Sequence, residues 1–145
     1  GLYFVFTAQE EVGLRGAGAA AFAVEPDVAI AVDVTDTGDL PEMKTPMAVE
    51  LGRGPAVKVM DRSVICTPAV VDALEQAAKD CGVSAQREIL LCGGTDTSAL
   101  QKARAGVQAG AVSIPTRYIH SPSELCAVSD VEDAAKLLAQ YALQK

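Results

Sequence analysis

The sequence predicts an α/β protein with a mainly parallel sheet and helices on both faces of that sheet. Three observations lead to this prediction. Short apolar runs alternate along the chain with segments whose apolar residues repeat at helical spacing. The run at Val28–Val32 is apolar at every position, which is typical of a strand buried on both faces. The chain has 145 residues, of which 50% are hydrophobic, and this suits one domain with one continuous core.

The first half of the chain predicts strands and a helix in alternation, followed by a loop. Pro26 separates the helix from the second strand, and Asp33 closes that strand. The segment 34–46 is rich in Thr, Asp, Gly and Pro, which favours a loop. The elements predicted from the apolar runs are a strand at Leu2–Phe6, a helix at Gly16–Val24, a strand at Val28–Val32 and two short strands within Val49–Met60.

The second half predicts three helices that alternate with two strands. Thr67-Pro68 gives the first of these helices a capping hydroxyl and a proline at its first position, and Gly82 ends it. Its apolar stripe is Val70, Leu74, Ala77 and Cys81. A capping box at Ser129–Glu132 opens the last helix. Between them we predict a strand at Arg87–Cys92, a helix at Thr97–Ala105 and a strand at Ala109–Ile114.

Charge and composition exclude several classes of partner. The chain has 12 Lys and Arg residues against 19 Asp and Glu residues, a net charge of −7. It offers no basic surface for phosphate groups, so we expect neither nucleic acid nor an acidic membrane as a partner. No apolar run approaches the roughly 20 residues that a membrane-spanning helix needs.

The cysteines and the first residues indicate the setting of the chain. The four cysteines have no metal-binding spacing, so we expect reduced thiols in a cytoplasmic protein. The chain begins with Gly1, directly before a predicted strand, and has no signal-peptide pattern. We therefore expect these residues to be a piece of a longer polypeptide.

Polar residues follow the predicted strands at their carboxyl ends, where open α/β sheets bind their ligands. Glu10 and Glu11 follow the first strand, Asp33 the second and His120 the last, while the remaining strand ends in Gly93–Asp96. Because these ends lie at one edge of a parallel sheet, we expect the carboxylates and the single imidazole to converge. Such donors suit zinc, cobalt or manganese. One of two adjacent carboxylates could bind metal while the other takes a proton from metal-bound water.

Each of these residues also has an ordinary structural interpretation. Glu10 and Glu11 suit the solvated start of a helix. Asp33 suits a turn at a strand end, and a single histidine such as His120 is more often a packed or surface residue than a ligand. Their expected convergence favours the metal site.

Five motifs carry a resemblance that spans nearly the whole chain. They are Phe6–Ala17 (FTAQEEVGLRGA), Ala31–Thr35 (AVDVT), Gly52–Asp61 (GRGPAVKVMD), Gly93–Asp96 (GGTD) and Pro115–Pro122 (PTRYIHSP). In this order they resemble the glutamyl and tetrahedral aminopeptidase family of dinuclear metallopeptidases, some members of which carry the name cellulase or endoglucanase. The resemblance implies a partial phosphorylase/hydrolase-like zinc-peptidase catalytic domain, with residues 1–145 as its C-terminal portion.

The resemblance also implies an activity and roles for individual residues. The family removes N-terminal residues from peptides with two metal ions, zinc or cobalt, that share a water. Glu10 would be the general base that activates this water, Glu11 and His120 would bind one metal, and Asp33 would bind the other. The family segments that line the site contain Thr95, Asp96 and Arg117, for which we expect a role in substrate binding.

The match to the family is incomplete at its upstream end. The family's full site includes a second His and a bridging Asp, and both precede the Glu-Glu motif, which here begins at Glu10. The inserted dimerisation domain, from which the family builds dimers and dodecamers, also lies upstream. We therefore expect a homo-oligomeric parent protein and a 145-residue piece that binds metal weakly and hydrolyses little, because catalytic zinc usually has three protein ligands. We also expect an exposed edge at Leu2–Phe6 that favours self-association or marginal stability.

Four alternatives stay open at this point. A dinucleotide-binding module is disfavoured because Gly13, Gly16 and Gly18 stand in the wrong order for its Gly-rich turn. A glycoside hydrolase of the endoglucanase type could use Glu10 with Asp33 as its two carboxylates. The other two alternatives are a cysteine nucleophile, Cys92 or Cys126 with His120, and a non-catalytic α/β fragment.

Overall fold

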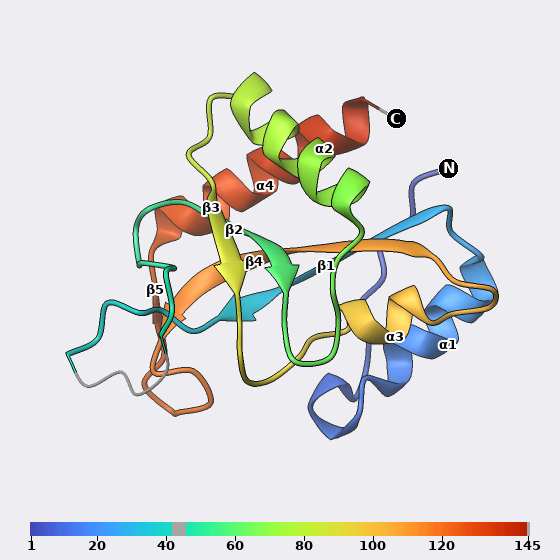
Figure 1. The fold of residues 1–145 in the computed structure, drawn as a ribbon, viewed down its shortest axis with the longest axis horizontal. Coiled ribbons are helices and arrows are strands. Elements are labelled where there is room, and N and C mark those ends of the chain that lie inside the picture. Colours follow the sequence, from blue (N-terminus) through green and yellow to red (C-terminus); the bar gives the residue numbers. More distant parts are fainter. Residues whose placement is uncertain (42–45, 145) are drawn as a thin grey trace.

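The computed structural model describes residues 1–41 and 46–144. Its strands form a five-stranded sheet in which β1, β4, β2 and β3 are neighbours in that order, and β5 pairs with β4. The elements, coloured along the chain in Figure 1, are η1 (Glu10–Val12), α1 (Arg15–Val24), β1 (Val28–Thr35), β2 (Ala56–Met60), α2 (Pro68–Asp80), β3 (Gln86–Ile89), α3 (Thr97–Gln101), β4 (Gln108–Arg117), β5 (Leu125–Cys126) and α4 (Val128–Leu143).

Two parallel strand pairs meet at an antiparallel junction. β1 pairs in parallel with β4 over its whole length, and β2 pairs in parallel with β3. β2 and β4 are antiparallel, with Ala56 opposite Ser113. A parallel neighbour needs a crossover, usually through a helix, and the described part of segment 36–55 between β1 and β2 holds no helix. The predicted α/β class is confirmed, and its sheet is mixed.

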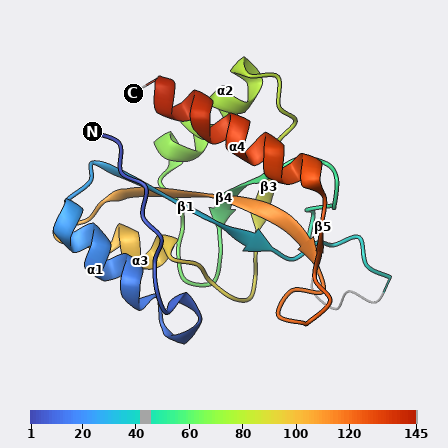
Figure 2. The same ribbon diagram turned by 180° about the vertical axis from the view of Figure 1, so that it is seen from behind.

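Helices cover both faces of the sheet, as predicted. α2 and α4 lie together on one face, and α1 and α3 lie on the other (Figure 1; Figure 2 gives the view from behind). Side chains alternate between these two faces along each strand. Within residues 1–41 and 46–144, no helix is long and apolar enough to cross a membrane.

The apolar core lies between the sheet and the α2/α4 pair. The predicted stripe of α2 is buried there, with Val70, Leu74 and Ala77 at the centre. Val112 of β4 and Leu137 of α4 complete the contact, and neither has exposed surface. The helical spacing of the sequence predicted the α2 part of this core.

The strand predicted at Leu2–Phe6 is not formed. All five side chains are exposed, from 51% for Val5 to 99% for Phe6, and the segment has no sheet partner among the described residues. An isolated strand leaves its backbone groups unpaired and is not stable on its own. Apolar composition without a neighbouring strand therefore leaves this segment without regular secondary structure.

Other boundaries differ where long-range contacts outweigh local signals. Of the two strands predicted within Val49–Met60, only β2 forms, and the preceding residues make a turn. β3 ends at Ile89 and α3 at Gln101, earlier than predicted, and the short strand β5 was not predicted. Arg104 (φ 54°) and Gly106 (φ 107°) have left-handed backbones, which ends helical structure before β4.

The predicted capping box at Ser129–Glu132 is wrong. α4 begins one residue before Ser129, after Ala127, and no side chain caps its first turn. The carboxylate of Asp130 instead accepts hydrogen bonds from the amides of Gly52 (2.8 Å) and Gly54 (2.9 Å). The first turn of α4 therefore contributes a contact distant in sequence rather than a local side-chain cap.

Candidate active site

Segments from four parts of the chain meet on the face of the sheet that carries α1 and α3. The turn around η1, the dark blue loop at the bottom of Figure 1, is joined to the Gly-rich turn by a 2.6 Å hydrogen bond from the hydroxyl of Thr7 to Asp96. The same turn meets the loop after β4 through Glu11 and His120. Asp33 lies close enough to Glu10 to affect its pKa. The predicted convergence is present, although β3 runs opposite to β4.

The backbone of the η1 turn is specified by its glycines. Gly13 has a left-handed backbone (φ 117°), and a Cβ at Gly16 would lie 2.5 Å from the amide nitrogen of Ala8. Gln9 (φ 62°) and Leu14 (φ 56°) are also left-handed, a conformation that costs roughly 1 kcal/mol or more for such residues. This strained turn presents the two consecutive acids Glu10 and Glu11, and strained backbone of this kind concentrates at functional sites.

The side chains of Glu11 and His120 are in direct contact. His120 Nε2 lies 3.3 Å from Glu11 Oε1, and about 70% of each side chain is exposed. An exposed contact of this kind contributes little to stability. Two ligands bound about 2.0–2.1 Å from a tetrahedral zinc are separated by about 3.3 Å, so the pair has the spacing of two donors to one ion.

The loop after β4 holds His120 in an unusual conformation. His120 (φ 60°) and Tyr118 (φ 60°) both have left-handed backbones. The amide of His120 donates a 2.6 Å hydrogen bond to Glu124 Oε1, and β4 pairs with β5 beyond this loop, with Arg117 opposite Leu125. Sequence reasoning missed Glu124, whose only signal is its place just after the His-Ser-Pro turn.

Asp33 stands apart from the Glu11–His120 pair. It is half-buried on β1, beside Ser113 of β4, and its Oδ1 accepts a hydrogen bond from the amide of Val34 (2.8 Å). Burial raises the pKa of the Asp33 carboxyl, while the Val34 amide and the charge of Lys58 act in the opposite direction. Three or more His, Cys, Asp or Glu side chains that could hold one metal do not occur together in the described part of the chain.

Glu10 has the electrostatics of a proton acceptor. Partial burial raises the pKa of its carboxyl, and the negative charges of Asp33, Glu11 and Asp96 raise it further, against a smaller opposite effect of His120. A carboxylate with a raised pKa is a stronger base. Glu10 can therefore take a proton more readily than an ordinary glutamate.

The substrate-binding candidates of the Gly-rich turn are buried beneath this cluster. The hydroxyls of Thr95 and Thr97 are hydrogen-bonded at 2.8 Å. Asp96 Oδ2 accepts the hydrogen bond from Thr7. Asp96 Oδ1 is buried without a hydrogen-bond partner among the described residues. A buried carboxylate oxygen without a donor can accept one from a bound molecule or cation.

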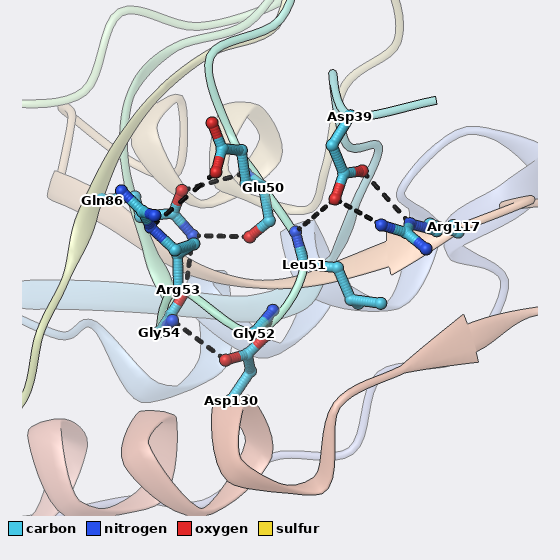
Figure 3. A network of polar contacts seen from close by, with 9 residues as sticks. All are labelled: Asp39, Glu50, Leu51, Gly52, Arg53, Gly54, Gln86, Arg117 and Asp130. Atoms are coloured by element: carbon cyan, nitrogen blue, oxygen red, sulfur yellow. Dashed lines mark hydrogen bonds and ion pairs between the residues drawn. The ribbon is translucent and has the colours of Figure 1, made fainter. Parts of the chain in front are cut away.

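Arg117 forms its ion pair with Asp39 rather than with Glu10, Glu11 or Asp33. Its guanidinium donates to both carboxylate oxygens of Asp39, at 3.2 and 2.6 Å (Figure 3). Asp39 also accepts a hydrogen bond from the amide of Leu51. The Arg117 guanidinium holds the pKa of the Asp39 carboxyl well below its usual range. This pair ties the end of β4 to the loop before β2.

A buried charged network lies on the same face of the sheet and was missed by sequence reasoning. Lys58 Nζ lies 2.6 Å from Glu88 Oε1 and 3.4 Å from Asp61 Oδ2, with no exposed surface on any of the three side chains. The hydroxyl of Thr35 donates to Glu88 at 2.8 Å. The position of Lys58 within one of the family motifs is the signal that could have drawn attention to it. Lys58 of this network lies close enough to Asp33 for its charge to affect the pKa of the Asp33 carboxyl.

The Gly52-Arg53-Gly54-Pro55 motif has a structural role in this arrangement. Asp130 binds the amides of both glycines, and Gln86 donates to the carbonyl of Gly54 at 2.8 Å (Figure 3). These bonds anchor the loop that also supplies the partner of Arg117. The motif therefore supports the site rather than lining it.

Comparisons with known proteins identify the family of this chain. Residues 1–137 match the family described as M42 glutamyl aminopeptidase. A candidate aminopeptidase of Acetivibrio thermocellus is 55% identical over 96% of this chain and 42% of its own length. The lysyl aminopeptidase of Pyrococcus furiosus is 40% identical over 94% of this chain and 38% of its own. The chain spans about two fifths of the length of these relatives.

Solved structures give the same result. An aminopeptidase of Desulfurococcus kamchatkensis is 40% identical over 96% of this chain and 40% of its own, with a TM-score of 0.88. A Pyrococcus horikoshii peptidase that can assemble into a tetrahedron or an octahedral shell is 34% identical over 94% of this chain and 39% of its own, with a TM-score of 0.81. An endoglucanase of Thermotoga maritima is 31% identical over 93% of this chain and 38% of its own, with a TM-score of 0.66. The chain therefore belongs to the M42 glutamyl aminopeptidase family.

Proposed function

We propose that the protein that contains this chain is a cytoplasmic metal-dependent aminopeptidase, which releases N-terminal residues from peptides. The observation that carries the proposal is the 3.3 Å contact between Glu11 and His120 beside the strained turn of Glu10. Two ligand types that zinc and cobalt accept stand at the separation of donors to one ion, next to a base. Family membership supports the peptidase reaction.

The proposed roles divide the acids by position. Glu11 and His120 hold one divalent metal, zinc or cobalt, and Asp33 holds a second. When bound, such ions lower the pKa of water and polarise the scissile carbonyl. Glu10 takes the proton from the attacking water and delivers it to the leaving amine. Its raised pKa suits both transfers.

Asp96 and Thr95 border the proposed substrate site from below. The buried Oδ1 of Asp96, which lacks a hydrogen-bond donor among the described residues, supports this role. Arg117 acts from a distance, because its guanidinium holds Asp39 and thereby the loop before β2. We propose that it positions the site.

The chain is proposed to be the C-terminal portion of the catalytic domain. Glu11 with His120 and the separate Asp33 give fewer than three protein ligands to each ion, the number that catalytic zinc usually has. The missing ligands, a second His and a bridging carboxylate, would come from the rest of the protein, together with the dimerisation domain of a homo-oligomer. This chain alone would be nearly inactive. Assembly of the Pyrococcus horikoshii relative into closed shells supports the oligomer.

Activity of the whole protein tests the proposal. We expect hydrolysis of peptides with a free N-terminus, none of N-acetylated peptides, loss after chelation, and recovery with zinc or cobalt. Glu10→Gln should abolish turnover, whereas Glu132→Gln, the same change on the exposed face of α4, should not. Activity that persists without metal, or in Glu10→Gln, would contradict the proposal.

Endoglucanase activity is the second candidate, because one structural relative is described in this way. A glycosidase that uses Glu10 and Asp33 as its carboxylates needs no metal. Hydrolysis of a soluble cellulose derivative in the presence of a chelator would favour it over the aminopeptidase.

A further inference from the structure

We infer that Glu124 is a positioning residue that fixes His120 as a metal ligand through the backbone of His120. The inference rests on the proposed role of His120. The hydrogen bond that Glu124 makes to this residue goes to its backbone rather than to its imidazole. Its Oε1 accepts a 2.6 Å hydrogen bond from the amide of His120, while the imidazole Nε2 faces Glu11 at 3.3 Å. The same residue is thus held on one side and presents its donor atom on the other.

The conformation of the loop shows why such a contact is needed. His120 and Tyr118 both have left-handed backbones, a conformation that residues other than glycine adopt at an energetic cost. An isolated seven-residue loop between β4 and β5 could relax to other conformations, and each would point the imidazole elsewhere. A hydrogen bond to the strained residue itself favours the one conformation in which Nε2 faces Glu11.

The position of Glu124 makes it suitable for this task. It directly precedes β5, whose Leu125 is opposite Arg117 at the end of β4. The backbone of Glu124 is therefore set by strand pairing, independently of any metal. Glu124 is fixed at the end of the sheet, and its hydrogen bond holds the backbone conformation of His120. Outer hydrogen-bond partners orient metal ligands in the same way in other proteins.

A second hydrogen bond in the loop provides a matched control. The amide of Ser123 donates to the hydroxyl of Ser121 at 3.2 Å. This bond lies within the same turn but does not involve His120. If any disturbance of the loop weakened the site, loss of this bond would do so too.

Metal affinity of the whole protein tests the inference without reference to turnover. Zinc or cobalt would be titrated into metal-free protein in competition with a chromophoric chelator, which resolves a tighter and a weaker ion. We expect Glu124→Ala to weaken one of the two ions about 10- to 100-fold and to leave the other unchanged. Glu124→Gln, which keeps an acceptor oxygen, should retain affinity within a few fold of the unaltered protein, as should Ser121→Ala.

Each outcome separates the inference from the proposed function. Equal weakening in Glu124→Ala and Glu124→Gln would mean that charge rather than the hydrogen bond matters, and would overturn the inference. Wild-type affinity in Glu124→Ala, with loss of one ion in His120→Ala, would also overturn it while the proposed role of His120 stands. Full metal binding in His120→Ala would reject the proposed function itself. A matched thermal unfolding curve for each variant would identify loss of affinity that arises from unfolding, in which case both ions weaken together and the inference fails.

Discussion

The two faces of the sheet are built from different residues for different purposes. Even-numbered residues of β1 and β4, such as Ile30 and Val112, face α2 and α4 and make an apolar core. Odd-numbered residues of the same strands, among them Asp33 and Ser113, face the side of the η1 turn, where Lys58 is buried with its acidic partners. The residues buried on the first face include the apolar ones that the helical spacing of α2 and the apolar run of β1 predict to be buried. The second contains buried charge and, in the loops beside it, left-handed backbones.

This contrast teaches where stability and chemistry are located in the chain. Apolar burial on the α2/α4 face stabilises the fold, and it fits local sequence signals. Strain and buried polar groups on the opposite face oppose stability, and such features concentrate at functional sites. Changes on the two faces should therefore have separable effects.

The largest expected effect is on turnover, from Glu10→Gln. General bases contribute about 10²- to 10⁴-fold to rate, so kcat of the whole protein should fall by that factor. The unfolding transition should change little, because Glu10 is only partly buried and makes no side-chain hydrogen bond to any described residue that would be lost. If Glu10→Gln destabilised the protein as much as a core substitution does, changes on the two faces would not have separable effects on activity and stability.

Lys58→Met should destabilise the protein by about 3–5 kcal/mol, because it leaves Asp61 and Glu88 buried without their cation. Denaturant unfolding followed by circular dichroism measures this. Lys136→Met, which removes an exposed pair with Asp133, is the control and should cost about 1 kcal/mol or less. Equal costs for the two variants would show that the buried network is not a structural unit.

Leu74→Ala should destabilise the protein by about 2–5 kcal/mol through the cavity that it leaves in the core. Its affinity for metal should be unchanged, because the cavity lies on the opposite face from Glu11. Leu143→Ala removes the same atoms from a side chain that is 84% exposed, and unfolding should then be unaffected. A metal site weakened by Leu74→Ala would mean that the two faces are coupled.

The smallest effect should come from Arg117→Met and depend on pH. Arg117 lowers the pKa of Asp39, so this pair stabilises the fold above the ordinary pKa of an aspartate, and its contribution disappears as the pH falls through the lowered value. The variant should be less stable by about 1 kcal/mol at neutral pH and should approach the wild-type stability as the pH falls below about 4. A stability difference that grows on acidification would have the wrong sign for this explanation.

The sequence predicted those parts of the molecule that depend on local contacts. The stripe of Val70, Leu74 and Ala77 gave α2, and the apolar run at Val28–Val32 gave β1. The antiparallel direction of β2 against β4 was not predictable, because the loop at 36–55 that leads into β2 carries no local signal for it. Leu2–Phe6 has the composition of a strand, but a strand exists only with a partner.

The candidate site was predicted through its motifs rather than through its geometry. Glu10, Glu11, Asp33 and His120 were identified before the fold was known, because each follows a predicted strand within a recognisable motif. The burial of Lys58 was not predictable, since alternation in Val57-Lys58-Val59 places the lysine on the second face without saying what covers that face. Glu124 was missed because a backbone hydrogen bond leaves no side-chain pattern.

The most direct test of the account is an anomalous diffraction map of the whole protein crystallised with zinc. The account predicts a zinc peak bonded to His120 Nε2 and to a carboxylate oxygen of Glu11, and a second zinc peak bonded to Asp33. Glu10 should bind neither ion. Zinc bound elsewhere, or no zinc peak at Glu11 and His120 in crystals saturated with zinc, would contradict it.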